Sequence, residues 1–283
     1  MNAVLRDSPN TRAIVSNTIV YVLMVAFALT MLVPFIWMLS ASLKRDIDVF
    51  TFPIVWIPRE PVWRNFASIW TRIPFVTFFL NTIKLTVIIT ALQLLTSSFA
   101  AYAFAKLQFS GRNVLFLGYV ATIALPWQVY MIPQFIIMRQ LGLTDTHLAL
   151  IIIQTFTAFG VFLMRQFYMN VPNELCDAAR IDGLSEYGIY ARIMLPLSVP
   201  ALATLTIFSF VFVWNDFMGP LIYLSSDNKK TIQLGLRLFI QQYGADYAHI
   251  MAASLVAMIP VIVLFVSFQR FYVQGIATSG LKG

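Results

Sequence analysis

Six long apolar stretches constrain the fold of this chain more than any other feature. They cover residues 14–42, 75–105, 113–137, 146–168, 193–223 and 247–273. A helix that crosses a membrane needs about 20 mostly apolar residues, and each stretch is long enough. Each is also too long and too apolar for a strand, and lipid excludes open sheet edges. We therefore predict an all-α integral membrane protein with six transmembrane helices, folded as one domain over residues 1–283.

The composition agrees with this class and excludes several kinds of site. The chain is 59% hydrophobic and only 11% charged, which is too apolar for a soluble core. No basic run suggests nucleic acid. The single cysteine and the two distant histidines, His147 and His249, give no metal-ligand spacing. The first apolar stretch is far longer than the about 7–15 residues of a signal peptide, so we expect it to be retained as a span.

Prolines and a few polar residues interrupt the predicted spans. Pro126 and Pro133 lie on either side of Gln128 in the third stretch, and each removes a backbone donor. The freed carbonyls must find partners in a neighbouring helix or in water, so Gln128 is a candidate for a solute pathway. Asp216, late in the fifth stretch, is a second candidate, because ionisable residues inside membranes tend to be functional. The alternative is that Asp216 lies near the membrane surface.

A connection rich in aromatic residues, 44–73, separates the first two spans. Trp63, Phe66 and Trp70 are spaced to share one face of a short helix. Aromatic rings favour the headgroup level of a bilayer, which predicts a helix lying at the interface. A docking surface for an extramembrane partner is the alternative.

Residues 171–200 form a polar interruption between the fourth and fifth spans. Asn173 can cap a first helix, and Ser185 can cap a second helix that Pro196 ends. Gly183 can supply the positive φ that turns the chain between them. A plain connection between spans is usually shorter than this. We refer to residues 171–192 as the elbow and predict that it docks on something outside the membrane.

The elbow carries a specific family resemblance. The segment DAARIDGLSEYGIYARIMLP, residues 177–196, resembles the EAA motif of permease subunits of binding-protein-dependent ABC importers. The matching residues are Ala178, Ala179, Gly183, Ile193, Leu195 and Pro196, while Asp177 stands where the family usually has Glu. The segments WNDFMGPLIYL (214–224), QQYGADYAHIMAAS (241–254) and QRFYVQGIATSGLKG (269–283) are similar to the carbohydrate importers of the maltose type.

The resemblance implies a type I permease fold in a prokaryotic inner membrane, with both termini cytoplasmic. The distribution of Lys and Arg is even across the two faces and does not orient the chain by itself. The elbow would then be a cytoplasmic coupling helix that seats on an ATPase subunit. Its expected contact residues are Asp177, Ala178, Ala179, Arg180, Gly183, Ile193 and Pro196.

The same resemblance implies partners and further site residues. The partners would be a second permease, two ATP-binding subunits that hold ATP and Mg²⁺, and an extracytoplasmic sugar-binding protein. Gln241, Gln242, Tyr243 and Gly244 match the segment that contacts the binding protein. Trp214, Asn215 and Asp216 combine aromatic and polar groups suited to a sugar pathway. The tail 275–283 resembles one that reaches between the two ATPases.

Three other functions are weighed against a sugar-importer permease. The chain has no phosphate-binding G-x-x-x-x-G-K-[ST] loop and no nucleophile or zinc motif, so we expect a non-catalytic subunit. A stand-alone secondary carrier would show internal repeats and paired charges at mid-membrane, and neither is evident. A membrane scaffold is disfavoured only by the motif match. An ABC permease for a solute other than a sugar stays an open alternative.

Overall fold

Helices make up most of the part of the chain that the structure describes, and that part contains no strand. This computed structural model describes residues 11–241 and 246–280. The helices are α1 (Thr11–Ser42), α2 (Arg64–Arg72), α3 (Phe75–Lys106), α4 (Arg112–Ala121), α5 (Trp127–Gln140), α6 (His147–Gln154), α7 (Ala158–Asn170), α8 (Asn173–Ile181), α9 (Glu186–Ile189), α10 (Leu195–Leu197), α11 (Val199–Trp214), α12 (Met218–Tyr223), α13 (Ile232–Gln241) and α14 (Tyr247–Gly280). Short helical turns η1 (Asp46–Asp48), η2 (Thr122–Ala124), η3 (Tyr190–Met194) and η4 (Asp227–Lys229) join them. The all-α prediction is confirmed.

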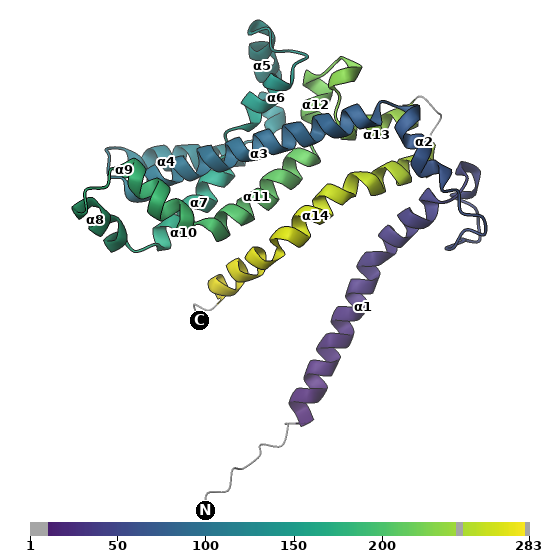
Figure 1. The fold of residues 1–283 in the computed structure, drawn as a ribbon, viewed down its shortest axis with the longest axis horizontal. Coiled ribbons are helices and arrows are strands. Elements are labelled where there is room, and N and C mark those ends of the chain that lie inside the picture. The colour runs from purple at the N-terminus through teal and green to yellow at the C-terminus, as the bar shows by residue number, and fades with distance from the viewer. Residues whose placement is uncertain (1–10, 242–245, 281–283) are drawn as a thin grey trace, which may run out of the picture.

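Three of the predicted spans are single unbroken helices. α1, α3 and α14 are each long and apolar enough to cross a membrane, over Ser16–Ser42, Phe75–Lys106 and Tyr247–Gln269. Figure 1 shows α3 running the length of the main body, α14 packed beside α11 and α1 projecting away from the body. Pro34 and Pro260 lie inside α1 and α14 without ending them.

Each of the other three predicted spans is a pair of helices with a bend between them, and not a single continuous helix. The third bends by 101° between residues 112–124 and 127–140, the fourth by 40° between α6 and α7, and the fifth by 77° between residues 186–197 and α11. The first break falls at Leu125, whose extended backbone is what a residue before proline prefers. If each bent pair is one span, the chain has up to six.

The core is built around α3. The main packing partners of α3 are α7 and α11. At one crossing the two backbones come very close, because a Cβ on Gly160 of α7 would lie 2.4 Å from the Ser97 hydroxyl of α3. Small residues at such crossings allow the close packing that holds membrane helices together. The buried face of α3 is also polar, with Thr82, Thr86, Thr90, Gln93 and Ser97.

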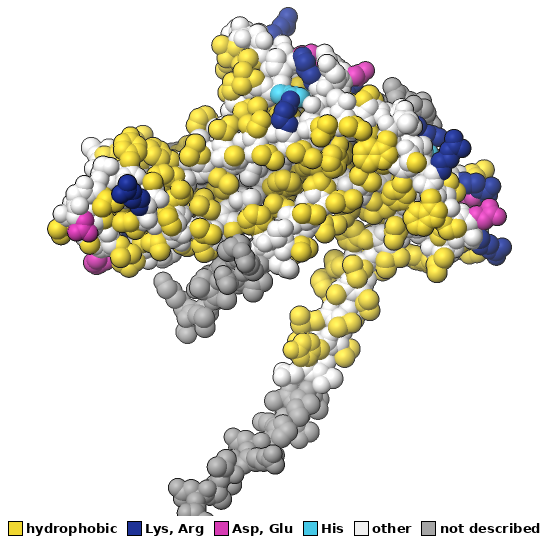
Figure 2. Space-filling view, in the orientation of Figure 1, with side chains coloured by type: hydrophobic (Ala, Val, Ile, Leu, Met, Phe, Trp, Pro, Cys, Tyr) yellow, Lys and Arg dark blue, Asp and Glu magenta, His cyan; other side chains and the backbone are white. Residues whose placement is uncertain are grey.

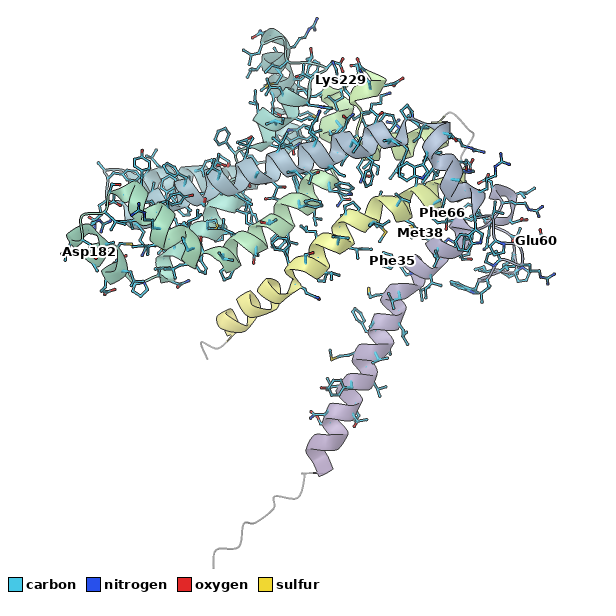
Figure 3. The ribbon with its side chains drawn as sticks, viewed as in Figure 1. Phe35, Met38, Glu60, Phe66, Asp182 and Lys229 are labelled. Atoms are coloured by element: carbon cyan, nitrogen blue, oxygen red, sulfur yellow. The ribbon has the colours of Figure 1, made fainter. Side chains whose placement is uncertain are left out.

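The surface shows where the membrane and the water lie. Figure 2 shows an apolar band over the body, with charged side chains gathered toward its ends and around α5 and α12. In Figure 3, Asp182 of the elbow and Glu60 of the loop after α1 lie at opposite ends of the molecule. The elbow and the connection 44–73 therefore lie at opposite ends of the bundle.

A short helix, α2, lies in the connection 44–73 where the sequence predicts one. Trp63, just before it, is 68% exposed and Trp70 is 41% exposed, while Ile69 is buried and Phe66 packs against the same core cluster. Two of the three predicted aromatic rings therefore face outward, and the position of the helix at a membrane interface stays a prediction.

Candidate functional site

The elbow is a short helix, a sharp turn and a second helix. α8 ends in a turn in which Gly183 has a φ of +82°. The Gly183 N–H donates to the Arg180 carbonyl and the Leu184 N–H to the Ala179 carbonyl, both at 3.0 Å. This pair of bonds satisfies the last carbonyls of the helix and requires a left-handed residue, which glycine adopts without strain. The predicted role of Gly183 agrees with this geometry.

Two other expectations about the elbow need correction. Asn173 does not cap α8 but is its first residue, and its side-chain oxygen accepts a hydrogen bond from Lys106 at 2.7 Å. Pro196 does not end the second helix. The helix passes through the π turn η3 and then through α10, and the chain bends only at Ser198. Ser185 does cap α9, accepting from the Gly188 N–H at 3.3 Å.

The predicted coupling residues divide between the surface and the core. Asp177 and Ala178 are exposed, as is Pro196, whereas Ile193 is half-buried. Ala179 is only 5% exposed and packs inward, so of the two alanines only Ala178 lies at the surface.

Sequence reasoning missed two apolar side chains at the tip of the elbow. Ile181 is 86% exposed and Tyr187 72% exposed. They stand on either side of the Gly183 turn. Ile181 projects away from the core, and the Tyr187 ring stacks on Phe99 of α3 with 5.9 Å between ring centroids while most of its surface stays exposed. Their position beside the turn was the available signal, because an apolar residue in an otherwise polar, water-facing segment is a candidate contact residue.

Arg180 is the electrostatic centre of the elbow. Its guanidinium donates to Asp177 Oδ1 at 2.6 Å and to Glu186 Oε1 at 2.7 Å. The hydrogen bond with Glu186, and then the one with Asp177, raise the pKa of Arg180 above its usual range. Glu186 Oε2 also accepts from the Tyr102 hydroxyl of α3 at 2.5 Å. Arg180 therefore ties α8 to α9, and Glu186 ties both to the bundle.

A large pocket lies at two of the helix breaks, far from the elbow. It has a volume of about 1070 Å³. It is lined from the α4–α5 break by Thr122, Ile123, Leu125, Pro126, Trp127 and Gln128, from the α6–α7 break by Ile153, Gln154, Phe156, Thr157, Ala158 and Phe159, and from α11 and the turn after it by Ile207, Phe208, Ser209, Val211, Phe212 and Asp216. Irregular backbone at membrane depth is tolerated where it lines a cavity, and both breaks do so.

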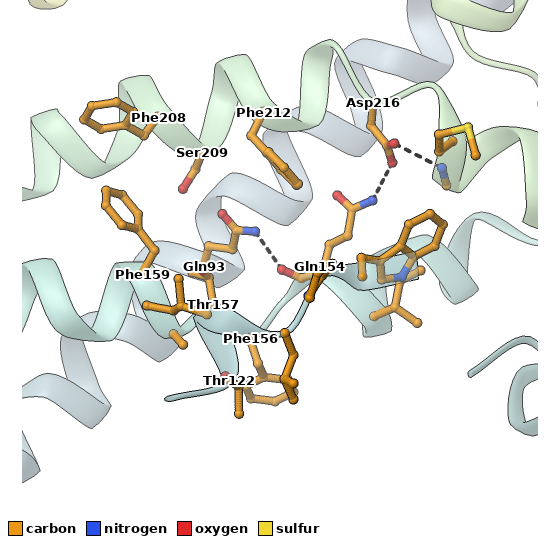
Figure 4. Close-up of a pocket in the computed structure, with 18 of the residues that line it drawn as sticks. Gln93, Thr122, Gln154, Phe156, Thr157, Phe159, Phe208, Ser209, Phe212 and Asp216 are labelled. Atoms are coloured by element: carbon orange, nitrogen blue, oxygen red, sulfur yellow. Dashed lines mark hydrogen bonds between the residues drawn. The ribbon is translucent and has the colours of Figure 1, made fainter. Parts of the chain in front are cut away.

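Three hydrogen-bonded polar residues, Gln93, Gln154 and Asp216, cross this apolar pocket (Figure 4), and we call them the polar line. The Gln93 amide of α3 donates to the Gln154 carbonyl at 2.7 Å, and the Gln154 amide donates to Asp216 Oδ2 at 2.7 Å. Asp216 Oδ1 accepts from the Gly219 N–H at 3.0 Å. Among the described lining residues, Asp216 is the one carboxylate and there is no Lys, Arg or His.

The predicted pathway residues do not all reach the pocket. Gln128 and Asp216 line it. Trp214 is 1% exposed and its indole N–H donates to the Ala257 carbonyl at 3.0 Å, so it holds α11 against α14. Asn215 is exposed and its amide bonds back to the Val211 carbonyl. Gln93 and Gln154 were missed, although an amide within an apolar stretch is a signal that sequence reasoning could have used.

The end of the bundle opposite the elbow holds a buried network that the sequence did not suggest. The His249 ring bonds to Asp246 Oδ1 at 2.7 Å and to the Ser68 hydroxyl at 2.7 Å, and Arg72 binds Asp246 Oδ2. The sequence Asp–His–Ser of hydrogen-bonded side chains resembles the catalytic triad of a serine hydrolase. Here, however, the Asp246 carboxylate also binds Arg72, and the Ser68 hydroxyl also donates to the Arg64 carbonyl of its own helix. The network therefore anchors α2 to the start of α14.

Two further predictions concern residues at the edge of the described chain. Gln241 is the last residue of α13, and Gln242, Tyr243 and Gly244 lie outside the described residues. α14 continues as a helix to Gly280, so the described part of the tail is helical. No group of three or more His, Cys, Asp or Glu residues suited to a metal ion occurs between residues 11 and 280 where the structure describes them.

Comparisons with known proteins agree on one family. A family model described as "Binding-protein-dependent transport system inner membrane component" matches residues 93–276. The arabinooligosaccharides transport system permease protein AraQ of Halalkalibacterium halodurans is 35% identical over 253 residues, 88% of this chain and 91% of that protein. The sulfoquinovosyl glycerol transport system permease protein SmoH of Agrobacterium fabrum is 32% identical over 254 residues, 89% of each chain.

A solved structure has the same fold. It is a bacterial ABC transporter involved in the import of the acidic polysaccharide alginate, with a TM-score of 0.82 and 26% identity, covering 94% of this chain and 99% of that chain. The region that the family model matches contains the elbow and all of the pocket-lining residues.

Proposed function

Because this chain belongs to the family of binding-protein-dependent transport system inner membrane components, we propose that it is one permease subunit of an ATP-driven ABC importer of carbohydrates. It would form half of the pathway and hydrolyse no ATP itself. The observation that carries the proposal is the elbow. It is a rigid, folded surface with exposed apolar side chains at one end of the bundle, and it lies within the segment that the family model matches.

The elbow is proposed to couple this chain to an ATPase subunit on the cytoplasmic side. Ile181, Tyr187 and Ala178 offer an apolar contact surface, and Asp177 adds a side chain that is 63% exposed. Gly183 and Ile193 would shape the elbow rather than form the contact. With six crossings, both termini would be cytoplasmic in a prokaryotic inner membrane, and the connection 44–73 and Gln241–Gly244 would face outside.

The pocket supports a carbohydrate solute. Sugars bind through aromatic faces and polar groups together, and the lining offers both. Its rings come from Trp127, Tyr130, Phe156, Phe159, Phe208 and Phe212, and its amides from Gln93, Gln128, Gln134 and Gln154. The lone carboxylate of Asp216 favours a neutral sugar over an anionic solute, because no cation in the described lining would balance a solute's negative charge.

The partners follow from what this chain lacks and from its relatives. The sequence contains no phosphate-binding loop, so ATP and Mg²⁺ would bind to two separate ATPase subunits. A second permease would complete the pathway. A related bacterial alginate ABC transporter was solved in complex with an alginate pentasaccharide-bound periplasmic protein, and it shares the fold at 16% identity and a TM-score of 0.55. A binding protein is proposed for this chain too.

The test is reconstitution of the complex with the products of the adjacent genes. We expect ATPase activity that the binding protein stimulates, and uptake of a neutral oligosaccharide that needs ATP and survives an ionophore. Uptake that proceeds without ATP and collapses with the ionophore would identify a secondary carrier instead. Preferential uptake of sn-glycerol 3-phosphate, the solute in the name of one relative, would identify a permease for a different solute.

A further inference from the structure

We propose that Tyr102 and Glu186 are positioning residues that connect the elbow to the pocket through α3. The inference rests on the proposed function, because it concerns how the elbow's movement reaches the solute pathway. In Figure 3 the elbow, marked by Asp182, lies at one end of the molecule. The chain continues from the elbow into α7 on one side and into α10 and α11 on the other, and the contacts with α3 offer a further route to the pocket.

The first step is the contact between the elbow and α3. The Tyr102 hydroxyl donates to Glu186 Oε2 at 2.5 Å, and Glu186 also binds Arg180 through both carboxylate oxygens, at 2.7 and 3.3 Å. Tyr102 is 3% exposed and lies in a cluster of buried apolar residues. A hydrogen bond to a charged group is stronger than a neutral one, and low local dielectric strengthens it further.

A second contact holds the same part of the elbow on α3. The Tyr190 hydroxyl of η3 bonds to the Ser98 hydroxyl at 2.8 Å, and the Tyr102 and Tyr190 rings lie 5.6 Å apart. Ser98 and Tyr102 are one helical turn apart, on neighbouring positions of α3. Lys106 at the end of α3 also donates to the Val171 carbonyl at 2.6 Å and to Asn173 Oδ1 at 2.7 Å. The elbow is therefore seated on α3 by several side-chain contacts and cannot tilt without moving α3 or breaking them.

The next step is along α3 itself. It is an unbroken helix from Phe75 to Lys106. Gln93 lies nine residues before Tyr102, which is about 14 Å at the helical rise of about 1.5 Å per residue. Residues 75–106 contain no Pro and no Gly, which are common causes of a sharp kink, so we expect the two ends of this helix to move together. The route through α10 and α11 instead crosses a 77° bend that can absorb movement.

The last step joins α3 to the break between α6 and α7. Thr96 donates to the Thr155 carbonyl at 2.9 Å and Gln93 to the Gln154 carbonyl at 2.7 Å. Both carbonyls lie at the break, where the last carbonyls of a helix lack partners further along the chain. The Gln154 side chain in turn binds Asp216. Movement of α3 along its axis would therefore displace the polar line that crosses the pocket.

The test uses the reconstituted complex and measures solute molecules imported per ATP hydrolysed. We expect Tyr102→Phe, which removes one hydroxyl, to lower this ratio about tenfold, with the KM for ATP unchanged. Tenfold corresponds to about 1.4 kcal/mol. Glu186→Gln should lower the ratio similarly, and the double variant should be no worse than either alone, since one contact cannot be lost twice.

Tyr168→Phe is the matched control. Tyr168 is a buried tyrosine of the same cluster, and its hydroxyl lies 3.3 Å from the Ser198 hydroxyl, away from Glu186. We expect its ratio to stay near that of the wild type. An equal fall in Tyr168→Phe would overturn the inference, because core packing would then explain the loss.

The remaining outcomes separate the inference from the proposed function. If the wild-type complex shows no ATP-driven uptake, both are overturned. If the wild type transports and Tyr102→Phe keeps the wild-type ratio, the inference alone is overturned. If Tyr102→Phe yields no assembled complex, the half-buried Glu186→Gln variant decides, and a wild-type ratio there overturns the inference.

Discussion

At the scale of single residues, the elbow depends on one backbone conformation. Gly183 has a φ of +82°, and a Cβ built on it would meet nothing within 4 Å. A larger side chain at this position would therefore be disfavoured by the left-handed backbone conformation and not by a steric clash with neighbouring atoms. The left-handed region costs an L-residue roughly 1–2 kcal/mol, and it is worst for β-branched side chains.

Gly183→Val should therefore distort the elbow while leaving the spans in the membrane. We expect a complex that is present at normal levels but imports solute poorly, as judged by ATP-driven uptake in vesicles. Gly183→Asn is the matched control, because asparagine tolerates the left-handed region, and it should retain most uptake. Normal uptake in the valine variant would show that the turn does not matter for coupling.

The residue scale is also where sequence reasoning was least complete. The need for a positive φ at Gly183 and the cap at Ser185 could be predicted, because both are satisfied within a few residues of chain. That Ala179 packs inward while Ala178 stays exposed could not be predicted. The direction of each depends on how α8 docks against the buried Tyr168 and Met194, which belong to other segments.

At the scale of elements, side-chain hydrogen bonds also fix the loops that connect the helices. The loop between α5 and α6 is closed by Asp145, which has a φ of 56°. Its carboxylate accepts from the Ser226 hydroxyl, from the Ser226 and Ser225 N–H groups, and from Lys229. These bonds, led by that from the Ser226 hydroxyl, hold the pKa of Asp145 well below its usual range.

The depressed pKa of Asp145 predicts a definite pH dependence. Its contribution to stability is complete above the unfolded pKa of about 3.9 and is lost as pH falls toward the folded pKa. Asp145→Asn keeps the shape and tolerates the left-handed backbone but cannot accept all of these bonds. We expect its thermal midpoint to fall below that of the wild type by the same amount at pH 8 and pH 5.

The difference between Asp145→Asn and the wild type should narrow below about pH 4. Asp227→Asn serves as control, because its exposed pair with Lys230 is a surface ion pair of the kind that contributes little. If the difference in thermal midpoint between Asp145→Asn and the wild type already narrows between pH 8 and pH 5, the pH dependence does not come from the Asp145 carboxylate.

At the scale of the whole molecule, the elbow and the connection 44–73 lie at opposite ends of the bundle. With the elbow proposed to be cytoplasmic, Glu60→Cys should react with a membrane-impermeant maleimide in spheroplasts, whereas Asp182→Cys should react only after lysis. The native Cys176 is 1% exposed, so background labelling should be low. Lys229→Cys should behave as Glu60→Cys does. Labelling of Asp182→Cys in intact spheroplasts would place the elbow outside and remove the coupling proposal.

The sequence by itself determined the membrane class, the all-α fold, the turn at Gly183 and the family. Each follows from a local property: the length of an apolar stretch, the need for a positive φ, or the order of residues within a motif. These do not depend on what a segment packs against, so the all-α prediction and the family were confirmed by the structure and the comparisons.

Only the tertiary structure decided where three spans break and what lines the pocket. Gln93, Gln154 and Asp216 meet there from three segments far apart in the sequence, while the neighbouring Trp214 turns away into the core. The physical reason is that an apolar stretch can bend wherever neighbouring helices satisfy the freed backbone groups. Which neighbours do so is set by packing between remote segments, and no local pattern records it.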